Sequence, residues 1–109
     1  MNSQSQNFSI WIEAEQWAPG DWTPADANSD VIVTFEEGKR WVATFFSYQN
    51  ISSLCKKNQA QGDCLGGNYF VATDMILVDE VSRERIEQVV IDLLRQNEFE
   101  TYFTFCENV

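Results

Sequence analysis

Hydrophobic and polar residues alternate along the N-terminal part of the chain, from Phe8 to Trp17. A period of two is typical of a strand with one buried face. The predicted inward side chains are mostly apolar, namely Phe8, Ile10, Ile12 and Ala14. The predicted outward side chains combine aromatic and acidic groups, namely Ser9, Trp11, Glu13, Glu15 and Trp17.

A loop of about a dozen residues is predicted next, because Pro19-Gly20 and Pro24 interrupt the alternation. Two runs rich in β-branched and aromatic residues, 30–36 and 39–48, then predict a hairpin. They meet at Glu37-Gly38, where glycine can take the positive φ of a tight turn.

The second half of the chain predicts two helices and two strands. Asn50 is the expected cap of a short helix over residues 51–60, which nearby glycines end. Residues 69–78 are nearly continuously apolar and predict a central strand covered on both faces. Ser82 is the expected cap of a helix over residues 82–97. Its apolar stripe consists of Ile86, Val89, Val90, Leu93 and Leu94.

A last alternating run, residues 99–106, predicts a strand with Phe99, Thr101, Phe103 and Phe105 on one face. The element order is therefore β-β-β-α-β-α-β, which predicts an α+β fold: a largely antiparallel five-stranded sheet with two helices packed on it. The connection after Val78 is long enough for a parallel crossover, so one parallel pair is compatible with this order. A chain of 109 residues predicts a single domain, 1–109, with residues 1–7 disordered.

The charge of the chain is strongly acidic, with 17 acidic and 7 basic residues and a net charge of −10. This exceeds the magnitude of about 2 to 8 that is typical of a small soluble domain. Such a surface repels nucleic acid and anionic membranes and attracts basic partners. Plain solubility is the alternative explanation.

The chain contains no histidine, which removes Ser-His and Cys-His catalytic pairs and the usual zinc sites. Asp26, Asn28 and Asp30 resemble the start of a calcium loop, but Val31 replaces the required glycine, so neither a metal nor a cofactor is expected. With no apolar run of membrane-spanning length and no signal-peptide layout, we expect a cytoplasmic protein. Reduced thiols are favoured, although a bridge between Cys55 and Cys64 stays open.

The outward carboxylates Glu13 and Glu15 would lie about 7 Å apart on an extended strand. This spacing suits an inverting glycoside hydrolase, but a partner-facing stripe or a covered or solvated face explains it as well. The predicted partner-binding residues are Trp11, Glu13, Glu15, Trp17, Asp21, Trp22, Asp26, Asp30, Glu36 and Glu37. Asp74, in the predicted central strand, is a candidate buried functional carboxylate, with a structural partner as its alternative role.

The segments "GKRWVATFFSYQNISSL" and "CLGGNYFVATDMILVDEVSRERIEQVVIDLL" look like parts of small uncharacterised bacterial proteins. In size, acidity and element order the chain resembles the immunity proteins of contact-dependent inhibition and polymorphic-toxin systems. The resemblance assigns no role to individual residues. It implies a non-enzymatic protein that neutralises a basic toxin, for example a nuclease, through an acidic surface that contains aromatic residues. We expect the protein to be a monomer or a weak dimer.

Two other classes of function stay open at this point. The first is a small-molecule or regulatory binding domain with a pocket lined by tryptophan. The second is a hydrolase that works through Glu13 and Glu15.

Overall fold

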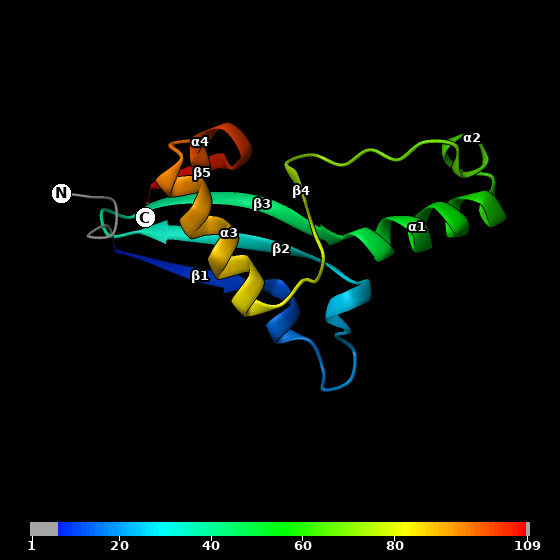
Figure 1. Ribbon diagram of the computed structural model, residues 1–109, viewed down its shortest axis with the longest axis horizontal. Coiled ribbons are helices and arrows are strands. Elements are labelled where there is room, and N and C mark those ends of the chain that lie inside the picture. The colour runs from blue at the N-terminus through cyan, green and yellow to red at the C-terminus, as the bar shows by residue number, and fades with distance from the viewer. Residues whose placement is uncertain (1–6, 109) are drawn as a thin grey trace.

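The computed structural model describes residues 7–108 and contains a five-stranded sheet with helices beside it (Figure 1). The strands are β1 (Phe8–Ile12), β2 (Asn28–Phe35), β3 (Lys39–Ser47), β4 (Met75–Val78) and β5 (Thr104–Asn108). The helices are α1 (Tyr48–Gln61), α2 (Cys64–Gly67), α3 (Arg83–Arg95) and α4 (Phe99–Tyr102). Two short 3-10 turns, η2 (Glu13–Gln16) and η3 (Pro24–Asp26), lie between β1 and β2. The predicted disorder of residues 1–7 falls, apart from Asn7, outside the described residues.

The sheet follows the order β1-β2-β3-β4, and β5 also pairs with β3. β4 pairs in parallel with the C-terminal half of β3, and β5 pairs antiparallel with its N-terminal half. These two strands therefore lie end to end along one edge of β3. The α+β class and the β2–β3 hairpin are confirmed. The parallel pair joins β3 to β4 through α1 and α2, and not through the connection after Val78 for which a parallel crossover was considered.

The core lies between one face of the sheet and α3, which crosses the strands in Figure 1. The alternation of the strands is the cause, because every second side chain of β2 and β3 points to the same side. Ser82 caps α3 as expected, since its hydroxyl oxygen accepts a hydrogen bond from the backbone N–H of Arg85 at 3.2 Å. The buried residues at this interface include Ile12, Val31, Val33, Ala43 and Phe45 of the sheet and Ile86 and Val90 of α3.

Helix α1 differs from its prediction in its cap and in its position. Ser47 is the cap, because its hydroxyl oxygen accepts a hydrogen bond from the backbone N–H of Asn50 at 3.2 Å. Asn50 lies inside the helix and its side-chain amide donates to Asp26 at 3.0 Å. α1 continues from the end of β3 and extends beyond the sheet (Figure 1). It ends at Gly62, whose φ of 79° is the left-handed conformation that glycine adopts readily.

The prediction of a central strand over residues 69–78 is wrong. Only β4 is a strand, and it lies at the edge of the sheet that it shares with β5. Asp74 has a φ of 54°, which interrupts an extended backbone immediately before β4. Val71 is 73% exposed and Leu77 is 44% exposed, so an apolar run does not here indicate burial on both faces.

The prediction of a strand over residues 99–106 is also partly wrong, because residues 99–102 form the helical turn α4. Phe99 and Phe103 are both buried, and their rings stack with centroids 4.3 Å apart. Residues four apart share a face in a helix as well as in a strand, so this pair fitted either structure. Thr101 and Phe105, which were expected beside them, are exposed.

Candidate functional site

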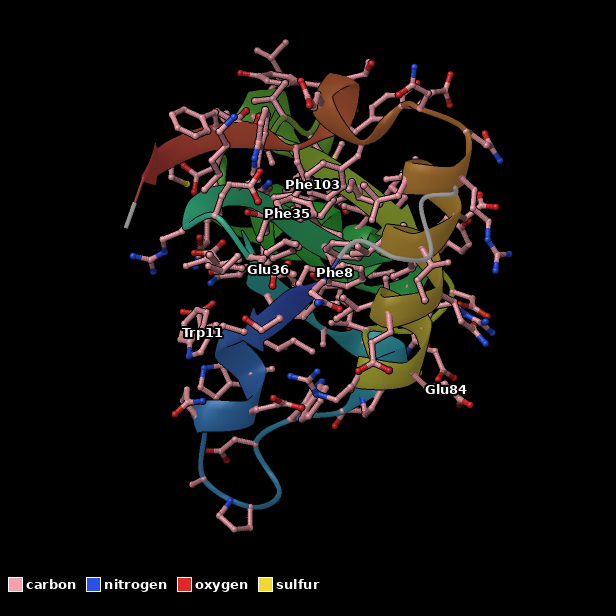
Figure 2. The ribbon with its side chains drawn as sticks, turned by 90° about the vertical axis from the view of Figure 1, so that its left-hand side faces the viewer. Phe8, Trp11, Phe35, Glu36, Glu84 and Phe103 are labelled. Atoms are coloured by element: carbon pink, nitrogen blue, oxygen red, sulfur yellow. The ribbon has the colours of Figure 1, made fainter. Side chains whose placement is uncertain are left out.

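The face of the sheet opposite α3 carries a row of apolar side chains. Trp11 of β1 lies opposite Ile32 of β2, and Ile32 lies opposite Val42 of β3. Figure 2 shows Trp11 on the side of the sheet away from α3, whereas Glu84 of α3 lies on the other side. Among the residues that the structure describes, no helix lies over this row. We call the surface formed by Trp11, Ile32 and Val42 the open face.

The side chains of the open face are only partly shielded from solvent. Trp11 is 43% exposed, and Ile32 and Val42 are half-buried. An indole with this exposure gives a binding partner a large apolar contact area at little cost in side-chain entropy. Apolar residues that are contiguous on a surface often mark a site of protein interaction.

Two carboxylates flank the open face where β1 ends. Because β1 ends at Ile12, the backbone N–H of Asp30 has no strand partner there and donates to the Glu13 carboxylate at 3.2 Å. The Asp30 carboxylate in turn accepts a hydrogen bond from the Thr44 hydroxyl at 2.8 Å. These contacts place two negative charges of the predicted interface next to Trp11.

Glu15 is directed to a different partner from Glu13. Its carboxylate accepts hydrogen bonds from Nε and Nη2 of Arg83 at 2.7 and 2.8 Å. Arg83 also donates to the backbone oxygen of Ile10 at 2.8 Å and forms an ion pair with Glu87 at 3.1 Å. The hydrogen bond with Arg83 lowers the pKa of Glu15, against a smaller opposing effect of desolvation and with further help from charge attraction.

The extended-strand alignment that was predicted for Glu13 and Glu15 is therefore absent. The strand that should have aligned them ends at Ile12, and η2 takes its place. One carboxylate binds a backbone N–H and the other forms a bidentate ion pair. The two groups have separate structural partners.

The loop that contains Trp17 and Trp22 is attached to the rest of the protein at several points. The indole N–H of Trp22 donates to the backbone oxygen of Val81 at 2.9 Å, and Val81 N–H donates to Pro24 oxygen at 2.8 Å. Trp22 also packs against the core. Trp17 is 37% exposed and Asp21 is exposed, so these two side chains are accessible on the same loop.

The other predicted site residues lie apart from the open face. Asp26 accepts hydrogen bonds from Asn50 and Ser53 of α1, both at 3.0 Å, and has a structural role. Glu36 and Glu37 are exposed in the turn between β2 and β3. Asp74 is half-buried and accepts a hydrogen bond from the Thr104 hydroxyl, so it joins β4 to β5. The predicted partner-binding residues therefore do not form a single surface. Trp11, Glu13 and Asp30 are the ones that lie together, at the open face.

Sequence reasoning did not identify Ile32 and Val42 as surface residues. The run Val31-Ile32-Val33 could have revealed Ile32, because an apolar residue occupies the outward position of an alternating strand there. The role of Arg83 was not predicted either, although it contacts η2 through Glu15 and β1 through the carbonyl oxygen of Ile10. These two partners are far from Arg83 in sequence, so no local pattern revealed them.

The fold and the site together define an α+β domain with one face of its sheet open. Comparisons with protein-family models, with curated proteins and with solved structures found no match. Within residues 7–108, no helix has the length and apolar character needed to cross a membrane. No group of three potential metal ligands occurs in that same part of the chain. Cys55 and Cys64 are not joined by a disulfide.

Proposed function

We propose that this protein is a non-enzymatic, immunity-type domain that binds and neutralises a basic protein through its open face. The observation that carries the proposal is the row Trp11, Ile32 and Val42, uncovered in the described chain and flanked by Glu13 and Asp30. An apolar centre with a charged rim is the common arrangement of protein interfaces. Trp11 is the expected energetic centre of the contact.

Electrostatics supports a basic partner. The chain has a net charge of −10, and both carboxylates beside Trp11 add to the negative potential of that face. A toxin that binds nucleic acid is commonly basic, because it must contact phosphates. An acidic inhibitor therefore gains a faster association with it, with rate constants of about 10⁸ M⁻¹s⁻¹ or more at low salt.

The experiment uses the full chain and the basic C-terminal domain of any large secreted protein encoded by a neighbouring gene. We expect tight binding, protection of growth when both are expressed, and an association rate that falls between about 0.1 M and about 1 M salt. Trp11→Ala should weaken binding by about 2 kcal/mol or more. Stopped-flow tryptophan fluorescence measures the rate, and growth of the co-expressing cells measures neutralisation.

Matched double variants separate the position of the charge from its amount. Glu13→Gln with Asp30→Asn removes two charges from the open face, and Glu84→Gln with Asp92→Asn removes two from the exposed surface of α3. Figure 2 shows Glu84 on the side of the sheet away from Trp11. We expect the first pair to slow association more strongly than the second. Equal effects of the two pairs, or an association rate independent of salt, would contradict the proposal.

A further inference from the structure

A cavity of about 550 Å³ lies beside the β2–β3 turn, between that end of the sheet, the C-terminal end of α3 and α4. Its volume falls in the range of about 300 to 1,000 Å³ that is typical of small-molecule sites. Its apolar wall consists of Phe35, Trp41, Leu94 and Phe99. Figure 2 views the molecule from this end, with Phe35 between the strands and the helices.

Trp41 is the most exposed aromatic residue of the cavity wall. Phe35 and Phe99 are buried, with exposures of 6% and 3%, whereas Trp41 is half-buried. The rings of Trp41 and Phe99 meet edge to face with centroids 5.8 Å apart, which fixes the position of the indole. Tryptophan is the aromatic side chain that binds cations most strongly through its ring face.

The rim of the cavity carries more negative than positive charge. Glu37 and Glu100 contribute two carboxylates, and Lys39 contributes one ammonium group. All three side chains are exposed, so their charges act on a ligand that enters from solvent. The overall charge of −10 adds to the attraction of a cation and to the repulsion of an anion.

We propose that this cavity binds a small organic ammonium ion with an apolar body. The cation contacts the ring of Trp41, Glu37 and Glu100 attract its charge, and the apolar body lies against Leu94. The cavity lies on the α3 side of the sheet, whereas the open face is on the other side. The proposal therefore does not depend on the function proposed for the open face.

The probes are choline and its uncharged isostere 3,3-dimethylbutan-1-ol, which differ only in the positive charge. Titration of the full chain, followed by the NMR signals of the indole N–H groups, reports binding, and Trp41→Phe assigns the signal of Trp41. We expect choline to shift that signal saturably, and the neutral isostere to bind at least about threefold more weakly. Equal binding of the two probes, or shifts confined to other indoles, would overturn the proposal.

Charge variants on the rim provide a second and independent measurement. Glu37→Gln and Glu100→Gln should each weaken choline binding by about threefold, and Lys39→Gln should strengthen it by a similar factor. All three positions are exposed, so the fold should tolerate the substitutions. The control is Glu84→Gln on α3, which does not line the cavity and should leave binding unchanged. An effect of Glu84→Gln as large as those of the rim variants would refute the assignment.

Discussion

Replacing Arg83 by methionine removes the charged connection between α3, β1 and η2 while keeping most of the apolar stem. The bidentate pair with Glu15 is about one third exposed, so we assign it about 1 kcal/mol, the upper end for a surface pair. The bond to the Ile10 carbonyl contributes about 1 kcal/mol, and the pair with Glu87 contributes about 0.3 to 0.5 kcal/mol. Arg83→Met should therefore lower the free energy of unfolding by about 2 kcal/mol.

Urea denaturation measured at low salt tests this value, and a thermal melt should show a Tm lower by about 10 °C. The control is Arg85→Met, because Arg85 binds exposed Asp79 and Gln88, which are close to it in sequence. Arg85→Met should lower the free energy of unfolding by less than Arg83→Met. A double-mutant cycle with Glu15→Gln should give a coupling of about 1 kcal/mol between Arg83 and Glu15. A coupling near zero, or equal effects of the two arginine variants, would contradict a stabilising role of the Arg83–Glu15 pair.

The same pair predicts a dependence of stability on pH. The pKa of Glu15 in the folded protein lies below its ordinary value near 4.5, because Arg83 donates hydrogen bonds to the ionised carboxylate. A carboxylate with a lowered pKa stabilises the fold at pH values above its unfolded-state pKa, and this contribution is lost as the pH falls through its folded-state pKa. The stability difference between the wild type and Arg83→Met should therefore shrink on acidification below about pH 4.5.

Three further predictions concern the packing of the fold. Trp22→Phe removes the hydrogen bond to Val81 and should cost about 1 kcal/mol, with faster hydrogen exchange in the attached loop. Gly67→Ala should loosen the junction of α1 and α2, because the new Cβ would lie 2.3 Å from the backbone oxygen of Cys55 and the residue has a φ of +82°. Hydrogen exchange of the α1 amides should become faster, and unchanged exchange would contradict the contact. Ile86→Ala empties a buried position under the sheet and should cost about 2 to 5 kcal/mol in a urea melt, whereas a loss under about 1 kcal/mol would argue against burial.

Local patterns predicted the elements whose partners are close in sequence. The hairpin of β2 and β3 closes at Gly38, whose φ of 91° is the conformation that the turn requires. Helix α3 has a clear apolar stripe, and its cap, Ser82, lies directly before its first turn. In the hairpin, the alternation and the turn residue indicated the same structure. In α3, the apolar stripe and the cap residue did so.

The errors arose where distant residues decide the outcome. Residues 69–72 are apolar but pair with no strand, and only β4 reaches the edge of β3. Asn50 has the chemistry of a cap, yet Ser47 occupies the position where the helix begins. At the candidate site, Trp11 was predicted to point outward and does so. Its neighbours Ile32 and Val42 were not predicted, because they lie beside Trp11 only through the register of three strands.

The arrangement of β4 and β5 along one edge of β3 has a consequence for the order of folding. β2 and β3 are joined by a short turn and can pair as soon as both are synthesised, whereas β4 and β5 come from much later in the chain. Loop closure makes such distant pairing slow, so the hairpin forms a template on which the later strands dock. Until β5 has left the ribosome, half of that edge of β3 stays open and can pair with another chain. Slow translation of the segment between β3 and β5 should therefore promote aggregation of this protein more than slow translation of the segment before β2.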